Sequence, residues 1–156
     1  MAYWKWDSSY ELGISVIDNQ HKRLVEYINE LQAALTTQNK EQIYAVLIGV
    51  TNYTISHFAF EEQLMEEAGY PMTGPHKKTH ESFVATIQKY KSSFEEGYHI
   101  TGQLMAEIQI WLTHHIVQDD SDYKEYVKKM IEDKNTKRLE NRVESKKKSW
   151  FSALFG

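Results

Sequence analysis

Cysteine is absent from this sequence of 156 residues. Its absence excludes disulfides, zinc–thiolate sites, iron–sulfur clusters and thiol nucleophiles. Proline and glycine are scarce, at two and seven residues, and β-branched residues seldom alternate with polar ones, so the composition favours helices. We expect no apolar run as long as the roughly 18 residues that a membrane-spanning helix needs. The N-terminus lacks the basic and apolar regions of a signal peptide. We therefore expect a cytoplasmic protein.

Charge and length set further bounds. The formal net charge is −4 at pH 7, so the chain as a whole gives no reason to expect a nucleic-acid partner. Hydrophobic residues make up 41% of the chain, enough for the core of one domain. Basic residues gather at the end, where residues 133–156 hold seven Lys or Arg and three Asp or Glu. This shift predicts a domain over residues 1–132 and a helical, basic, aromatic-ended tail over residues 133–156.

Four segments carry apolar side chains and histidines at alternating steps of three and four residues, the spacing of one helix face. The expected helices cover residues 18–37, 40–67, 75–95 and 101–118. Short connections such as GYPMTGP make neighbouring helices antiparallel, which predicts an all-α, up-down-up-down four-helix bundle. The aromatic-rich residues 1–16 are expected to form an extended arm packed on the bundle. A short fifth helix is expected near residues 122–132.

Five of the seven histidines fall on the core-facing side of these helices. They are His21, His57, His76, His80 and His115. A single histidine on an apolar face is usually a core residue with one hydrogen bond. Five unsatisfied imidazoles would cost several kcal/mol, because each unsatisfied buried polar group costs about 1–3 kcal/mol. In an up-down-up-down bundle all five lie at the same end, so the sequence predicts a metal site between the helices.

Carboxylates at helical spacing complete this constellation. Glu61 lies four residues after His57, on the same helix face. Imidazole and carboxylate suit iron, zinc, copper or nickel, and five imidazoles with two carboxylates are too many for one ion but fit two. Spacing alone favours Asp119 as the second carboxylate, since it lies four residues after His115. Asp120 lies about 140° from His115 round an ideal helix and would need a bulge to join the cluster.

The residues around these positions resemble the motifs of the hemerythrin family. In chain order the matching stretches are GISVIDNQHKRL, HFAFEE, HKKTH and WLTHHIVQDDSDY. They cover roughly residues 3–131, and the single-domain form resembles the bacterial members. The resemblance implies a non-haem di-iron centre with an oxo or hydroxo bridge. The implied ligands are His76, His80 and His115 for one iron, His21 and His57 for the other, and Glu61 with an aspartate as the bridges.

The family motif also decides between the two aspartates. It has an aspartate five residues after the histidine and a tyrosine three residues further on, and Asp120 and Tyr123 match this pattern. We therefore take Asp120 as the bridging ligand, against the preference from spacing. Asp119 is interpreted as a solvated acid at the helix end, and His114 as an outward-facing side chain.

The resemblance implies reversible dioxygen binding for oxygen storage, delivery or sensing, because the iron with two histidines keeps one open position. Trp111, Leu112 and Ile116 flank the ligand turn and are candidates for the wall of a dry oxygen pocket, although plain core packing explains them equally well. The alternatives are a di-iron enzyme (an oxidase, peroxidase or nitric-oxide reductase), an iron-handling protein, a sensor or delivery module, or a zinc-bound or purely structural site. Oxygen-activating ferritin-like bundles carry two Glu-x-x-His motifs. This chain has one, EGYH at residues 96–99, in a glycine-containing turn, so its histidine-rich set favours binding over catalysis.

The tail bears on partners other than dioxygen. Leu139, Val143, Trp150 and Leu154 lie near helical spacing beside a cluster of three lysines. One hypothesis is a weak contact of this tail with an anionic membrane surface or a membrane protein. A solvated tail, or one packed on its own bundle, is the alternative. We expect a monomer and no nucleic-acid partner.

Overall fold

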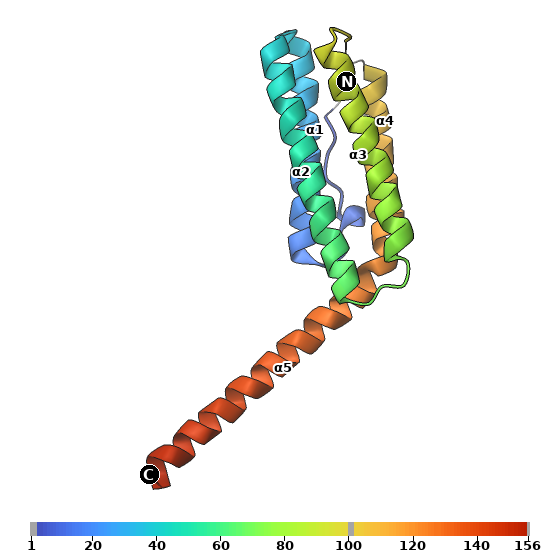
Figure 1. The fold of residues 1–156 in the computed structure, drawn as a ribbon. Helices are drawn as coiled ribbons and strands as arrows, with labels where there is room; N and C mark the ends of the chain where they lie inside the picture. The colour runs from blue at the N-terminus through green and yellow to red at the C-terminus, as the bar shows by residue number, and fades with distance from the viewer. Residues whose placement is uncertain (1–2, 100–101, 156) are drawn as a thin grey trace.

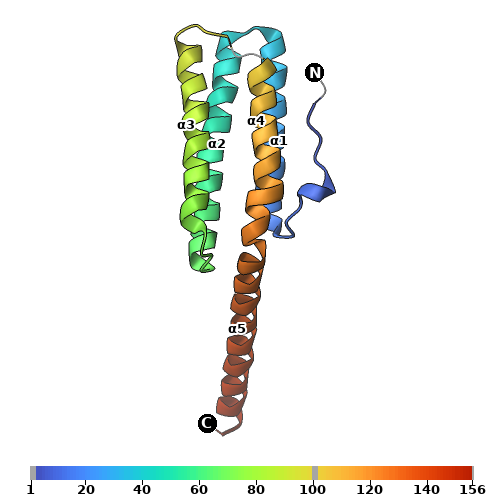
Figure 2. The ribbon, with the colours of Figure 1, turned by 90° about the vertical axis from the view of Figure 1, so that its right-hand side faces the viewer.

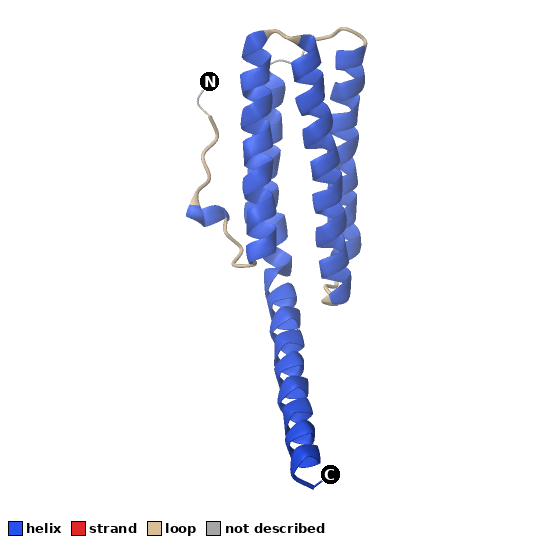
Figure 3. Ribbon diagram, turned by 90° about the vertical axis from the view of Figure 1, so that its left-hand side faces the viewer, coloured by secondary structure: helices blue, strands red, loops and turns tan. Residues whose placement is uncertain are grey.

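A computed structural model describes residues 3–99 and 102–155, with the backbone alone at Gln103 and Phe155. Every regular element within these ranges is helical (Figure 3). The elements of the bundle are a short 3-10 helix η1 (Ser8–Tyr10), α1 (Ser15–Thr37), α2 (Lys40–Glu67), α3 (Thr73–Glu95) and α4 (Gly102–His114). The four α-helices lie side by side and run up-down-up-down (Figure 1), so the predicted four-helix bundle is confirmed.

The connections between the helices follow turn signals in the sequence. Asn39 caps α2, because its side chain accepts a hydrogen bond from the backbone N–H of Gln42 at 3.1 Å. Beyond α2 the chain turns at Gly69, whose φ of +69° lies in the left-handed region that glycine adopts without steric cost. These tight turns place the start of α3 beside the end of α2, where the predicted ligands lie.

The N-terminal arm lies along the bundle beside α1, as expected (Figure 2). Trp4 and Asn29 exchange two hydrogen bonds of 2.8 Å: the Trp4 N–H donates to Asn29 Oδ1, and Asn29 Nδ2 donates to the Trp4 carbonyl. At the other end of the arm, Asp18 accepts hydrogen bonds from the backbone N–H groups of Leu12 (2.7 Å) and Gly13 (3.1 Å). These bonds fix the arm to α1 at two points.

The C-terminal part differs from the expectation of a short helix. One helix, α5 (Asp120–Phe155), continues α4 through a π-helical segment, η2 (His115–Asp119). It projects away from the bundle (Figure 1), and every side chain over residues 132–154 is exposed. The predicted end of the fifth helix near residue 132 is wrong, whereas the helical C-terminal tail that we expected is confirmed. The sequence from 120 to 155 contains no glycine or proline, so nothing in it stops the helix where burial ends.

Buried apolar side chains form two clusters, one on either side of the predicted ligands. The larger cluster fills the bundle interior and includes Leu24 and Phe58. The smaller cluster closes the end from which α5 departs; its members are Leu12, Ile14, Ile17, Met65, Tyr123 and Val127. His21 lies between the two clusters on α1, and Glu61 lies between them on α2. The polar residues are thus enclosed by apolar packing along the bundle axis.

Helix α2 corrects the expectation that no apolar run in this chain is long enough for a membrane span. By length and composition alone it is apolar enough to cross a membrane, because residues 43–60 contain no Asp, Glu, Lys or Arg. In the structure α2 packs between α1 and α3 and buries His57 and Glu61. Its apolar character is therefore explained by its place in the core of the bundle.

Candidate metal centre

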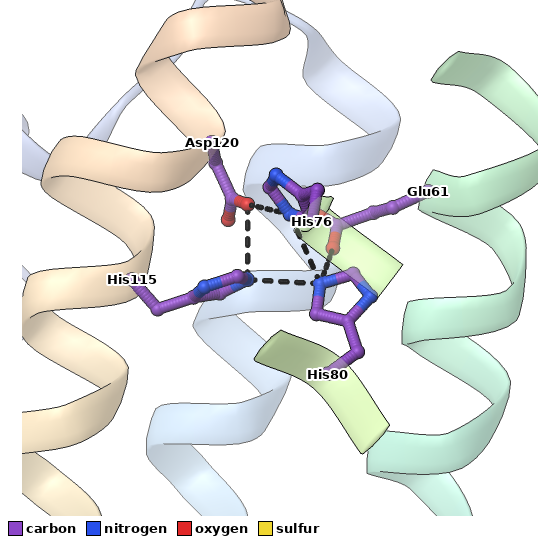
Figure 4. A group of neighbouring side chains, drawn as sticks. All are labelled: Glu61, His76, His80, His115 and Asp120. Atoms are coloured by element: carbon purple, nitrogen blue, oxygen red, sulfur yellow. Dashed lines mark hydrogen bonds and ion pairs between the residues drawn. The ribbon is translucent and has the colours of Figure 1, made fainter. Parts of the chain in front are cut away.

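The structure brings all seven predicted ligand residues together. Since Asp120 is the first residue of α5, the cluster lies at the end of the bundle from which α5 departs. They form two groups that share one carboxylate. The larger group, drawn in Figure 4, comprises Glu61, His76, His80, His115 and Asp120. The smaller group comprises His21, His57 and Glu61. Within each group the ligand atoms lie within 4.8 Å of one another, and every residue is buried.

Asp120 faces both groups, with one oxygen toward each. Its Oδ1 lies 3.0 Å from His115 Nε2 and 3.2 Å from His76 Nε2, both in the larger group. Its Oδ2 lies 3.2 Å from His21 Nε2 in the smaller group. The carboxylate therefore spans the space between the two sets of histidines.

Glu61 spans the same space from α2. Its Oε1 lies 3.3 Å from His21 Nε2 and 3.4 Å from His57 Nε2. Its Oε2 lies 3.4 Å from His80 Nε2 in the larger group. Two carboxylates from different helices thus connect a group of three histidines with a group of two.

The donor atoms fit a pair of metal ions better than they fit one another. Among the described residues, both ring nitrogens of His21, Glu61 Oε2 and both oxygens of Asp120 are buried and make no hydrogen bond. Such atoms are costly to bury, at about 1–3 kcal/mol each or more when charged. Ligand atoms at right angles, each about 2.1 Å from one ion, lie about 3.0 Å apart, close to the observed contacts of 3.0–3.4 Å. Imidazole with carboxylate suits iron among other metals.

A π-helical turn places Asp120 on the same face as His115. The backbone N–H of Asp120 donates to the carbonyl of His115, five residues earlier, rather than to the residue four earlier. This extra residue removes the rotation of about 140° that an ideal helix would put between the two side chains. The structure therefore contains the bulge that Asp120 needs to reach the cluster, and Asp120 is fully buried.

Asp119 corrects another expectation, because it is not simply a solvated acid. Its Oδ2 accepts a hydrogen bond of 2.9 Å from His115 Nδ1, the ring nitrogen that faces away from the cluster. A carboxylate can only accept here, so the bond keeps the proton on Nδ1 and directs Nε2 inward. The spacing of four residues thus identified a partner of His115 rather than a member of the cluster. His114 is exposed, as expected.

Two other histidines have outer partners that the sequence reasoning missed. His80 Nδ1 donates to Glu62 Oε1 at 2.9 Å, and His57 Nδ1 donates to Gln20 Oε1 at 2.7 Å. In both, the bond leaves the Nε2 lone pair facing the cluster, as metal-binding histidines require. The available signal was their place in the quoted motifs, since Gln20 directly precedes His21 and Glu62 directly follows the second-helix glutamate.

Comparison with known proteins identifies the family. Residues 12–127 match the hemerythrin HHE cation binding domain. The chain belongs to the hemerythrin family. It is 42% identical over 128 residues to bacteriohemerythrin from Stenotrophomonas maltophilia, covering 82% of this chain and 84% of that one. It is 40% identical over 139 residues to bacteriohemerythrin from Pseudomonas aeruginosa, covering 86% and 91%. A crystal structure of wild-type hemerythrin aligns with a TM-score of 0.77 at 25% identity, over 81% of this chain and 98% of that chain.

Burial and charge set the protonation of this hemerythrin cluster. Burial lowers the pKa of His57 to about 4 and that of His80 to about 3, so both rings are neutral at pH 7. Burial also lowers the pKa of His21 and His115, but contacts with Asp120 and the other carboxylates outweigh it. The pKa rises to about 9 for His21 and about 10 for His115. A metal ion that bound to these two rings would have to displace a proton from each of them.

Tyr123 closes the hemerythrin centre on the side of α5. Its hydroxyl donates a hydrogen bond of 2.7 Å to Glu61 Oε1, and the side chain is fully buried. Burial and the nearby carboxylates raise the pKa of the phenol well above its usual 10, so it stays protonated and keeps donating. Its ring centroid lies 5.6 Å from that of His76. The tyrosine of the family motif therefore touches the centre directly.

Aromatic rings cover the larger group of histidines from inside the bundle. Phe58 stacks on His80 with ring centroids 3.8 Å apart and planes 2° apart. Trp111 stacks on Phe83 at 3.8 Å and on His115 at 4.6 Å. Of the three residues predicted for an oxygen pocket, Trp111 thus lies against the three-histidine group. The other two are also buried, Leu112 on α4 and Ile116 in η2.

Proposed function

We propose that this chain binds dioxygen reversibly at a non-haem di-iron centre. The main supporting observation is that two buried carboxylates each direct one oxygen toward the group of three histidines and the other toward the group of two. The irons would be held by His76, His80 and His115 on one side, by His21 and His57 on the other, and by Glu61 and Asp120 between them. An oxo or hydroxo bridge, which the family resemblance implies, belongs to the same proposal.

The unequal histidine count supports binding of a small exogenous ligand. With shared carboxylates, a metal held by His21 and His57 would have one protein ligand fewer than a metal held by the three-histidine group, which would leave room for a small ligand such as dioxygen. The iron pair, when bound, supplies the electrons that dioxygen takes up and gives back. The chain's own part is to hold both ions, to keep Nε2 lone pairs directed inward through the outer hydrogen bonds, and to exclude water.

Exclusion of water favours reversibility, because water and protons would otherwise promote release of reduced oxygen species. Apolar clusters lie on both sides of the centre, and all seven predicted ligands are buried. Leu112 and Ile116, at 2% and 0% exposure, remain our candidates for the wall beside the open position. Trp111 shields the three-histidine side instead, where it stacks on His115.

We also propose that binding, rather than catalytic turnover, is the main activity. The donor set is rich in histidine, and the one Glu-x-x-His sequence, at residues 96–99, is exposed in a turn after α3. It therefore adds no carboxylate to the centre, unlike the paired motifs of oxygen-activating bundles. A monomeric state and a cytoplasmic location, both expected from the sequence, complete the proposal.

The test is the visible absorption spectrum of iron-loaded, anaerobically reduced protein, recorded before air, in air and after purging with argon. We expect a colourless reduced form, a visible band in air, and loss of that band on purging, with two irons per chain. Irreversible conversion to a ferric spectrum would overturn reversible binding. His115→Ala should lower the iron content, whereas His114→Ala, which alters the adjacent exposed histidine, should keep two irons and the reversible band.

A further inference from the structure

The part of α5 beyond the bundle carries an apolar stripe. Leu139, Val143, Trp150 and Leu154 have 53–61% of their surface exposed. At 100° per residue these four side chains fall within about 60° of the helix circumference, over four turns. The hemerythrin HHE match ends at residue 127, so the function proposed above does not account for this stripe. The stripe is the apolar face of an amphipathic helix, and the bundle does not cover it.

Basic side chains border the stripe. Lys146 and Lys147 lie about 20° beyond its two edges on the helix circumference. The acidic Glu144 is paired with Lys148 at 3.5 Å. Since the whole chain carries −4 and residues 133–156 carry +4, the remaining residues carry −8. An anionic surface would therefore attract this segment and repel the bundle.

The helix holds the stripe away from the bundle. Residues 132–155 extend about 36 Å as a helix, and no glycine or proline interrupts α5. Lys134 Nζ donates to Glu67 Oε2 at 2.7 Å, which ties the base of the projecting segment to the end of α2. Folding the stripe back onto its own bundle would require breaking a continuous helix.

We propose that the stripe of α5 docks reversibly on the surface of an anionic lipid bilayer. The helix lies in the plane of the interface, with the stripe in the headgroup and acyl boundary and the lysine stems reaching back to the phosphates. Trp150 is suited to this boundary because its indole is apolar with one polar N–H. So few large apolar residues give weak, salt-sensitive binding rather than permanent anchoring.

The same residues disfavour a second copy of α5 as the occupant. A coiled coil needs apolar residues every three or four positions along its seam. Here the stripe is interrupted between Val143 and Trp150, where Lys146 takes the seam position. Two such helices would bring like charges together, whereas an anionic bilayer satisfies both the apolar and the basic side chains.

The experiment is flotation of the full iron-loaded chain with vesicles of phosphatidylcholine alone or mixed with phosphatidylglycerol. We expect partitioning to be about ten-fold stronger with the anionic vesicles and to fall as salt rises toward 0.5 M, because screening weakens charge attraction. Negligible binding of the full chain to the anionic vesicles would overturn the proposal. So would equal binding to both vesicle types.

Two pairs of variants, each with a matched control, test whether vesicle binding depends on the stripe and its lysines rather than on exposed apolar or basic residues elsewhere. Val143→Ser with Trp150→Ser should reduce partitioning about ten-fold, whereas Tyr98→Ser with Ile110→Ser, which removes exposed apolar surface elsewhere, should leave it unchanged. Lys146→Gln with Lys147→Gln should abolish the preference for anionic vesicles. The same two-charge change at Lys40 and Lys89 should preserve it.

Other occupants give distinct outcomes. Iron content and the visible spectrum should stay unchanged in every variant, because all the substituted residues are exposed. Full retention of vesicle binding by the stripe variant would refute docking through this face. Dimerisation in sedimentation that depends on the stripe, without vesicle binding, would show a second copy instead. Capture of a random oligonucleotide, without vesicle binding, would show a nucleic-acid contact and equally reject the bilayer.

Discussion

Replacing Asp119 by asparagine keeps an acceptor beside His115 but removes its negative charge. The contact is a hydrogen bond of 2.9 Å between Asp119 Oδ2 and His115 Nδ1, with the carboxylate 32% exposed. Hydrogen bonds to charged groups contribute about 1.5–3 kcal/mol and neutral ones about 0.5–1.5 kcal/mol. The difference of about 1 kcal/mol corresponds to about five-fold weaker binding of one iron. Asp119→Ala, which removes the acceptor as well, should weaken it about 10–100-fold.

The assay is anaerobic competition for ferrous iron with a coloured chelator, followed until both irons leave the protein. We expect the variants to lose one iron at a lower chelator concentration, because Asp119 supports only the three-histidine group. The second iron should be extracted nearly as in the unmodified chain. Asp122→Asn, at an exposed aspartate three residues further on, is the matched control. If Asp119→Ala holds both irons as tightly as this control, the outer hydrogen bond does not position His115 as argued.

Three further predictions concern the stability of the centre. Tyr123→Phe removes the hydroxyl that donates to Glu61, a loss of about 1.5–3 kcal/mol, and should lower the thermal midpoint of the iron-loaded protein by several degrees in circular dichroism. An unchanged midpoint would contradict a structural role for that bond. Removing iron with a chelator should lower the thermal midpoint by more than Tyr123→Phe does, since a ligand at about 1,000 times its Kd adds about 4 kcal/mol of stability. Identical melting curves with and without iron would contradict a metal site in the folded protein. Phe58→Ala opens a cavity beside His80 and should cost about 3–5 kcal/mol in urea unfolding, and a loss below 1 kcal/mol would show that the stacked ring is not close-packed.

The bundle could be predicted from the sequence because burial imposes the period on α1 to α4. Steps of three and four residues mark the buried face, and the bounds expected for α2, residues 40–67, coincide with those observed. A helical tail was expected, but its continuity with the fifth helix as one long α5 could not be predicted in this way. Its residues from 132 onward are exposed, so no buried face constrains their pattern, and the helix continues only because nothing interrupts it.

Helical spacing also predicted the cluster, except for the second carboxylate. Convergence of the histidines follows from antiparallel helices, and Glu61 follows from its spacing after His57. The outer hydrogen-bond partners Glu62 and Gln20 were not predictable from periodicity. An acid or amide next to a ligand in the sequence looks like an ordinary surface residue until the position of the neighbouring helix is known. The contacts of 2.9 Å and 2.7 Å depend on the packing of α2 against α3 and α1.

The π-helical turn explains why spacing chose the wrong aspartate and also how α5 joins the bundle. On the buried face, His115, Asp120, Tyr123 and Val127 follow one another at steps of five, three and four residues, and all four are at most 1% exposed. Only the first step departs from an ideal helix. That single extra residue turns Asp120 inward and leaves Asp119 free to hold His115. It also sets the rotation of everything downstream, so that Tyr123 reaches Glu61 and Val127 packs in the smaller cluster. A regular α-helix through this segment could satisfy the spacing of Asp119 or the burial of Tyr123. It could not place one carboxylate in the cluster, at Asp120, and the outer hydrogen-bond partner of His115, at Asp119, on adjacent residues.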